Sequence, residues 1–171
     1  YNNLGLALVD KKQFDTAVKY YRKSLKIKPG CAETYFNIGS ALVEKGDLDP
    51  AIHNLQKALQ IMPSHDKSCN NMGAALRAKG ELRAAIKSYD RAIEINPKQV
   101  GARYNKSMLL LKLEEFKMGW PAYEYRWKKS KLDSVPVISS RPKWRLGDRG
   151  KVLVWGEQGI GDEIMFSSLI P

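Results

Sequence analysis

The stretch AETYFNIGSALVEKGDLDPAIHNLQKALQIMPS, residues 32–64, decides the fold because its pattern recurs along the chain. When the sequence is shifted by 34 residues, a glycine, an alanine and a proline of this stretch meet identical residues in the flanking segments. The three recurring sets are Gly5, Gly39 and Gly73; Ala17, Ala51 and Ala85; and Pro29, Pro63 and Pro97. A fixed period of about 34 residues with small residues at set places indicates a repeat protein.

Each repeat is predicted to be two antiparallel helices. In residues 32–45 the apolar residues recur at helical spacing, and Gly39 lies on the same face, where a second helix could approach closely. Gly46 can end the first helix in a left-handed cap. Asp49 is then expected at the N-cap of a second helix, which Pro63 ends. Because neither helix can bury its apolar stripe alone, neighbouring repeats are expected to stack.

The period, its small residues and its closing proline resemble the tetratricopeptide repeat (TPR) family. The resemblance implies an all-α fold, a right-handed superhelical α-solenoid, over residues 1–133. We expect three regular repeats and a divergent fourth one, at residues 1–31, 32–65, 66–99 and 100–133. In the fourth repeat Ser107 replaces the glycine and Gly119 replaces the alanine, so this repeat is expected to have a different neighbour. Because Tyr1 falls inside a repeat, the chain is expected to be a fragment.

The C-terminal part of the chain changes character. Residues 134–150 are basic and contain two prolines, which favours an irregular connector. The valine-rich run KVLVW, residues 151–155, predicts a buried strand. A glycine-rich turn, residues 156–162, and the start of a helix follow it. This order is typical of the opening of an α/β nucleotide-binding domain, so residues 151–171 are predicted to be its incomplete beginning.

The net charge of +11 raises the question of nucleic-acid binding. Residues 1–30 carry seven Lys and Arg against two acids, and residues 126–151 carry nine against two. Residues 31–125 are nearly balanced, and no base-stacking aromatic pattern accompanies either cluster. We therefore interpret the first cluster as a solvated helix face and expect no nucleic-acid partner. The second cluster has the chemistry to meet phosphate, acidic protein or anionic lipid.

The cysteines and histidines form no recognisable site. Cys31 and Cys69 lack metal-ligand spacing, so the sequence predicts no metal, no disulfide and no cofactor in these residues, and favours a reducing, cytoplasmic location. Cys69 is expected to be a small core residue. His53 and His65 are expected in ordinary surface or packing roles. The sequence has no apolar run of about 18 residues, so no transmembrane segment is expected.

Asparagines recur in the first helices at the same period, at Asn3, Asn37, Asn71 and Asn105. At about 100° per residue they lie far from the apolar stripe and are expected to turn away from the helix packing. First helices line the concave groove of a TPR superhelix, so these asparagines would form a ladder along it. Their amides could hold the backbone of an extended peptide. Neighbouring candidates on this face are Asn2, Phe36, Asn70 and Tyr104. The alternative is that the asparagines only support the helix stack.

The asparagine ladder resembles the TPR arm of the O-GlcNAc transferases, which holds extended polypeptide substrates. A second TPR binding mode, the carboxylate clamp of chaperone adaptors, grips a C-terminal carboxylate. Asn37 and Lys67 fit that pattern. Asn2, Leu6 and Asn71 stand where lysine, asparagine and arginine would be needed. We therefore expect the extended-peptide mode.

A second resemblance covers the end of the chain. Three motifs occur in a fixed order: EEFKMGWPAYEYRW at 114–127, PKW at 142–144 and KVLVWGEQGIGDEIMF at 151–166. They resemble bacterial TPR proteins fused to a heptosyltransferase-like glycosyltransferase domain, which implies a nucleotide-sugar donor in the full-length parent. The resemblance gives Gly159 and Gly161 to a phosphate turn and makes Asp162 the general base that activates the acceptor hydroxyl. The alternative for Asp162 is a helix N-cap, with the glycines permitting the turn.

The sequence therefore predicts a protein- or peptide-binding TPR module. Its parent is expected to be a bacterial-type glycosyltransferase in which this module recognises the acceptor. Residues 1–171 alone are expected to lack transferase activity. The alternative from a different class is a non-catalytic scaffold that self-associates through its open repeat edges.

Overall fold

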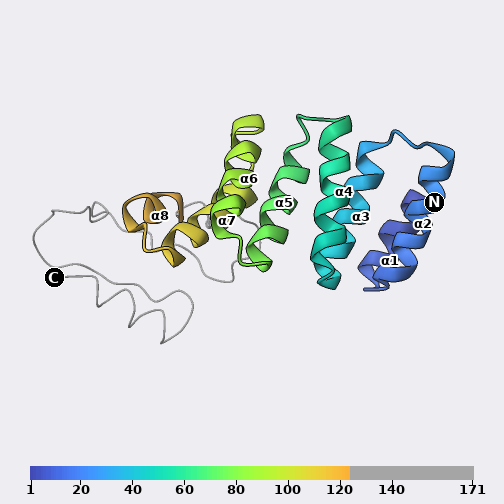
Figure 1. The fold of residues 1–171 in the computed structure, drawn as a ribbon, viewed down its shortest axis with the longest axis horizontal. Coiled ribbons are helices and arrows are strands. Elements are labelled where there is room, and N and C mark those ends of the chain that lie inside the picture. The colour runs from blue at the N-terminus through green and yellow to red at the C-terminus, as the bar shows by residue number, and fades with distance from the viewer. Residues whose placement is uncertain (124–171) are drawn as a thin grey trace, which may run out of the picture. The chain divides into compact units, whose positions relative to one another are not determined.

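The computed structural model describes residues 1–123, and their regular secondary structure is entirely helical. The eight helices of this part are α1 (Asn2–Asp10), α2 (Phe14–Ile27), α3 (Ala32–Lys45), α4 (Leu48–Ile61), α5 (Asp66–Ala78), α6 (Leu82–Ile95), α7 (Val100–Lys112) and α8 (Phe116–Tyr123). They follow one another in chain order from α1 to α8 (Figure 1). The predicted all-α, solenoid-like fold is confirmed for these residues. The connector at 134–150 and the strand at 151–155 lie outside them, and the handedness of the superhelix stays a prediction.

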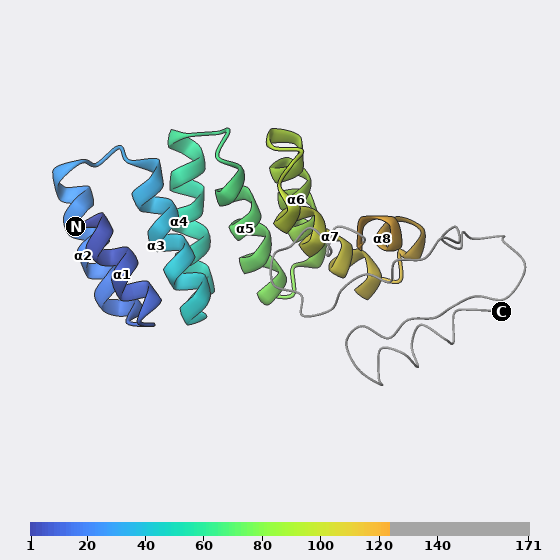
Figure 2. The ribbon, with the colours of Figure 1, turned by 180° about the vertical axis from the view of Figure 1, so that it is seen from behind.

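Each repeat consists of a first helix (α1, α3, α5 or α7) and a second helix (α2, α4, α6 or α8). Figure 2 shows the same row of helices from behind. A first helix packs against its own second helix, which in turn packs against the first helix of the next repeat. The first helices also contact one another along the row. Within residues 1–123 the backbones of the second helices do not approach one another. The first helices therefore form a continuous face, while the second helices stand apart.

A glycine on the first helix of each regular repeat lets a bulky residue of the second helix approach closely. The facing pairs are Gly5–Tyr21, Gly39–Leu55 and Gly73–Tyr89. A Cβ atom at Gly39 would lie 2.7 Å from Cγ of Leu55, well inside van der Waals contact. Leu55 is completely buried, which contributes on the order of 1.5–3 kcal/mol to stability. The contact face predicted for Gly39 is thus confirmed.

The hydrophobic core runs through the helix pairs of single repeats and across the junctions between repeats. One cluster joins α2, α3 and α4 and contains Ala17, Ile38 and Ala51. Another joins α5, α6 and α7 and contains Cys69 and Ala85. Cys69 is only 1% exposed, so its predicted role as a small core residue is confirmed. Packing within each repeat and stacking between repeats thus bury the apolar stripes together.

The turn between the two helices of each repeat has a left-handed residue at a fixed place of the period. Gly46 and Gly80 have φ angles of 93° and 84°, and Lys12 and Glu114 have 57° and 60°. The predicted cap at Gly46 is confirmed, and its N–H donates to the carbonyl oxygen of Leu42 at 3.0 Å. A residue with a side chain pays roughly 1–2 kcal/mol for this conformation. The first and fourth repeats therefore carry strain that the central two avoid.

The expected N-cap at Asp49 is wrong, because Asp47 takes that position and Asp49 lies in the first turn of α4. The carboxylate of Asp49 accepts instead from Lys79 of the next repeat at 2.7 Å. Lys45 binds Asp15 in the same way, at 2.6 Å. These hydrogen bonds raise the pKa of both lysines. Asp49 thus connects two repeats rather than capping its own helix.

Candidate functional site

The asparagine ladder occupies one equivalent position on each first helix, α1, α3, α5 and α7. Asn3 is exposed, and Asn71 and Asn105 are half-buried. Asn37 is only 9% exposed, so the expectation that all four side chains turn away from the helix packing is wrong for Asn37. The first helices contact one another, so a polar side chain between them loses much of its access to solvent.

A chain of hydrogen bonds crosses three first helices on this face. Nδ2 of Asn105 on α7 donates to Oδ1 of Asn70 on α5 at 3.2 Å. Nδ2 of Asn70 donates to Oδ1 of Asn71 at 3.3 Å. Nδ2 of Asn71 donates to Oγ of Ser40 on α3 at 3.1 Å. Two ladder asparagines and a predicted neighbour therefore hold adjacent first helices in place.

A separate hydrogen-bonded pair joins the first two repeats. Nδ2 of Asn2 on α1 donates to Oγ1 of Thr34 on α3 at 3.0 Å, and the Thr34 hydroxyl lies 3.3 Å from Oδ1 of Asn2. Thr34 is fully buried. Neither Thr34 nor Ser40 was a predicted site residue. The signal that could have found them is a hydroxyl residue on a first helix next to an asparagine-bearing first helix.

These hydrogen bonds leave the asparagine amides with capacity to spare. An asparagine side chain has two N–H donors and two acceptor lone pairs. Asn70 and Asn71 each use one donor and one lone pair in the chain, and Asn105 uses one donor. Each retains at least one donor and one lone pair for another group. The network thus orients a row of half-buried amides that keep unused hydrogen-bonding groups.

Two aromatic residues border the asparagines. Phe36 packs edge-on against the ring of His65, with centroids 5.0 Å apart. Tyr104 stacks on Tyr123 of α8, with centroids 5.9 Å apart. Both Phe36 and Tyr104 are half-buried, so each ring also has an exposed part. The aromatic members of the predicted face are therefore fixed by packing.

His65 holds the start of α5. Its Nδ1 accepts from the backbone N–H of Ser68 at 3.2 Å and lies 2.7 Å from the Ser68 hydroxyl. Its Nε2 lies 3.2 Å from Oε2 of Glu33 on α3. The ordinary packing role predicted for His65 is confirmed, with helix capping added to it.

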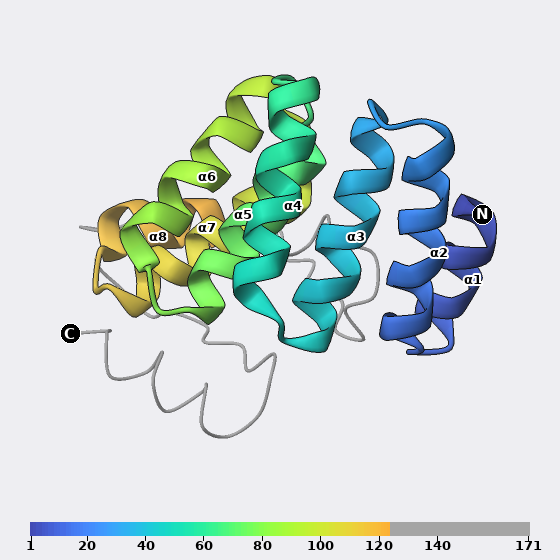
Figure 3. The same cartoon turned by 45° about the vertical axis from the view of Figure 1, so that its right-hand side comes forward.

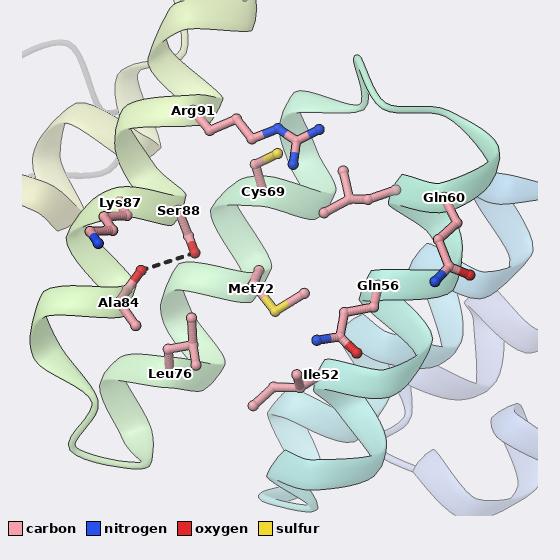
Figure 4. Close-up of a pocket in the computed structure, with 11 residues that line it drawn as sticks. Ile52, Gln56, Gln60, Cys69, Met72, Leu76, Ala84, Lys87, Ser88 and Arg91 are labelled. Carbon is pink, nitrogen blue, oxygen red and sulfur yellow. Dashed lines mark hydrogen bonds between the residues drawn. The ribbon is translucent and has the colours of Figure 1, made fainter.

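A groove of about 680 Å³ lies elsewhere in the stack, between α4 and α6 with α5 as its floor (Figure 4). Figure 3 shows α5 between these two second helices. Met72 and Leu76 line the floor together with Cys69, Arg91 borders the groove on α6, and Gln56 borders it on α4. Burial raises the pKa of the Cys69 thiol, which keeps it neutral and a weak nucleophile. The thiol in the groove is therefore not activated for nucleophilic attack.

Several other expectations concern charge, metals and membranes. The basic residues of the first cluster are all exposed, as expected for a solvated face: Lys19, Arg22, Lys23, Lys26 and Lys28. Among residues 1–123 no group of three or more metal-ligating side chains comes together. None of the helices in this same part combines the length and the apolar character that a membrane crossing requires. The predicted turn at Gly159 and Gly161 and the predicted base Asp162 lie outside the described residues.

Comparison with known families gives two matches along the helical stack. A tetratricopeptide repeat model matches residues 1–64, and another tetratricopeptide repeat model matches residues 67–99. Among curated proteins, Protein FlbA of Caulobacter vibrioides is 34% identical over 71 residues. This stretch covers 40% of the present chain and 12% of that protein. The chain thus spans a small part of the length of that relative.

Solved structures show the same arrangement of helices. The crystal structure of MamA is 27% identical, with a TM-score of 0.66 and coverage of 75% of each chain. MamA from Desulfovibrio magneticus RS-1 is 16% identical, with a TM-score of 0.67 and coverage of 76% of each chain. The first TPR of Spaghetti (RPAP3), solved with an HSP90 peptide, is 23% identical with a TM-score of 0.63. That match covers 66% of the present chain and 90% of the other. These likenesses support a stack of helix pairs.

Proposed function

Because the chain belongs to the tetratricopeptide repeat family over residues 1–64 and 67–99, we propose that its first-helix face binds an extended polypeptide through the peptide backbone. The carrying observation is the chain of half-buried amides from Asn105 through Asn70 to Asn71, each with spare hydrogen-bonding capacity. Ordered amides bind with a smaller entropic cost than mobile ones. The module is a protein-interaction unit, and backbone recognition by asparagines is its proposed mode.

The test compares two variants that affect the same internal hydrogen bond. Asn71→Ala removes both the bond to Ser40 and the spare capacity of the amide, whereas Ser40→Ala removes the bond and keeps the amide. Extended peptides selected on the wild-type chain from a random library would be titrated by calorimetry. Each lost ligand hydrogen bond is worth about 0.5–1.5 kcal/mol, so the double variant Asn70→Ala/Asn71→Ala should bind roughly fivefold to a hundredfold more weakly.

The controls separate binding from stacking. Ser40→Ala should reduce the urea midpoint no more than Asn71→Ala does, while keeping wild-type affinity. Asn54→Ala, on the second helix α4, removes an asparagine whose amide bonds the carbonyl oxygen of Pro50 and should leave affinity unchanged. If the double variant binds as tightly as wild type, the asparagines have only the stacking role.

A finer proposal concerns the parent protein, and it rests on the resemblance of residues 114–127, 142–144 and 151–166 to bacterial TPR–glycosyltransferase fusions. In that parent the TPR module would present a polypeptide acceptor, and Asp162 would activate its hydroxyl group. In the full-length protein Asp162→Asn should lower sugar transfer by about 10²–10⁴, because asparagine can cap a helix yet cannot act as a base. Release of nucleoside diphosphate measures this. Full activity of the variant would return Asp162 to a capping role. A reducing, cytoplasmic location is part of the same proposal.

A self-assembling scaffold, in which repeat edges stack between chains, is the second candidate. A second copy that covered α1 with its α8 would extend the row. In the stack, Lys45 pairs with Asp15 of the preceding repeat. Between two copies, Lys117 would stand in the place of Asp15 and Lys11 of the second copy in the place of Lys45, so two lysines would meet. This like-charge contact disfavours that register, and sedimentation at increasing concentration would measure assembly directly.

A further inference from the structure

We propose that the groove between α4 and α6 is a second peptide site, which takes one large apolar side chain flanked by acidic residues. The groove and the asparagine ladder use different sides of α5. At about 100° per residue, Cys69, Met72 and Leu76 share one side of this helix, and Asn71 points to the opposite one. The site therefore goes beyond the proposed function and can be occupied independently of it.

The groove exists because a large residue is replaced by a small one. The backbones of the second helices α4 and α6 do not approach each other, and side chains of α5 line the space between them. Cys69 stands at the position that Tyr35 holds in the preceding repeat. Tyr35 is half-buried, and its ring is much larger than a thiol group. The cysteine thus leaves room above it.

The remaining volume suits an inserted side chain. At about 680 Å³ the groove lies within the range of roughly 300–1,000 Å³ that is usual for ligand sites. Met72, Leu76 and Ile52 give it an apolar lining, and the flexible thioether of methionine adapts to different shapes. An aromatic or large aliphatic side chain would therefore replace water against an apolar surface.

The charge at the groove selects an acidic partner. Lys87 and Arg91 line the α6 side, and none of the described residues that line the groove is acidic (Figure 4). Arg91 uses one guanidinium donor on the carbonyl oxygen of Pro63 at 3.1 Å, which leaves donors for a carboxylate. Gln56 and Gln60 on the α4 side offer neutral amides that can meet a peptide backbone. A second copy of this chain, with a net charge of +11, would be a poor occupant.

The experiment uses residues 1–171 and a fluorescent peptide in which one tryptophan lies between two pairs of aspartates. Anisotropy should show binding that weakens with added salt, as expected for a partly ionic contact. Cys69→Tyr fills the groove with the residue of the preceding repeat and should lower the affinity by about tenfold or more. The double variant Lys87→Glu/Arg91→Glu changes only exposed positions and should lower it by a similar factor.

Matched controls decide between this site and general attraction to a basic protein. Lys57 has the same position in the second repeat as Arg91 in the third, and the second repeat has Tyr35 where the third has Cys69. Lys57→Glu reverses a charge there and should leave the affinity unchanged. Asn70→Ala/Asn71→Ala should also leave it unchanged, which separates this site from the asparagines of the first-helix face. A peptide with alanine in place of tryptophan should bind weakly. Absence of binding by the wild-type chain, or equal losses in Lys57→Glu and Lys87→Glu/Arg91→Glu, would overturn the proposal.

Discussion

The three regular repeats and the fourth repeat carry the small residue of the contact between their two helices on opposite helices. In the regular repeats the small residue is on the first helix, as at Gly73, and the bulky residue is on the second, as at Tyr89. In the fourth repeat the glycine is on the second helix, α8, where a Cβ at Gly119 would lie 2.6 Å from Cδ2 of Leu111 on α7. Ser107 has taken the place of the first-helix glycine and is fully buried.

This difference shows that close approach of two helices needs one small residue, on either partner. Ser107 remains compatible with burial because its hydroxyl donates to the carbonyl oxygen of Tyr104 at 2.7 Å. Leu111 extends toward the place where the other repeats have an alanine methyl group, as at Ala85. The divergent repeat is therefore a rearranged contact rather than a loosely packed one.

The largest expected effect comes from adding bulk to a regular repeat. Gly39→Leu would place Cβ 2.7 Å from Leu55 and 3.2 Å from the backbone oxygen of Ala51, which cannot turn away. Overpacking of this kind costs about 1–3 kcal/mol or more. We expect a clearly lower urea midpoint, followed by circular dichroism. Gly101→Ala is the control, because nothing lies within 4 Å of a Cβ there and a helical alanine should stabilise. An unchanged midpoint for Gly39→Leu would contradict the packing.

The next prediction tests the rearranged contact. Gly119→Ala restores the alanine of the other repeats, yet its methyl group would collide with Leu111. We expect a loss of about 1–3 kcal/mol in the free energy of unfolding. Combined with Leu111→Val, the loss should shrink, because the shorter side chain frees the space. A double-mutant cycle by urea unfolding measures this coupling, and strict additivity would rule out the direct contact.

The smallest effect concerns the bulky partner itself. The hydroxyls of Tyr21 and Tyr89 are buried and have no hydrogen-bond partner within residues 1–123. Burial raises the pKa of each from 10.0 to about 12, and Asp10 adds to the effect at Tyr21. The folded state therefore keeps these protons longer than the unfolded state, and stability present below pH 10 is lost as the pH rises toward 12. Leu55 fills the same place without a hydroxyl.

Tyr89→Phe should consequently leave stability at neutral pH unchanged or slightly higher, because the removed group is unsatisfied. The alkaline loss of stability should become smaller. Part of that loss should remain in the variant, because the pKa values of Lys45 and Lys79 are also raised. Urea midpoints measured across the alkaline range test this. A large loss at neutral pH would mean that the hydroxyl has a bonding partner.

Much of the fold follows from the period because helix packing repeats with it. Gly39 and Gly46 were predicted in their packing and capping roles, since both depend on the local residue type. Asp49 was assigned to the wrong role because its partner, Lys79, lies in the next repeat. The sequence around the start of a helix does not show whether an acidic residue caps that helix or pairs with a lysine of the next repeat.

The candidate site was less predictable. The spacing located the asparagines, but the bond from Asn71 to Ser40 was not foreseen, because serine does not recur at that position of the period. Cys69 was recognised as a small residue in the place of Tyr35. The groove above it depends on the distance between α4 and α6, which cannot be derived from the sequence of α5.

The contacts between helices also determine how the stack should melt. Each helix of residues 1–123 contacts only its own repeat and the adjacent ones, so stability is a sum of repeat terms and nearest-neighbour terms. Such a one-dimensional system opens from its ends, and amide hydrogen exchange should be slowest in α3 to α6 and faster in α1. Damage at one internal junction would divide the cooperative unit there, so that the segments on either side exchange and unfold independently.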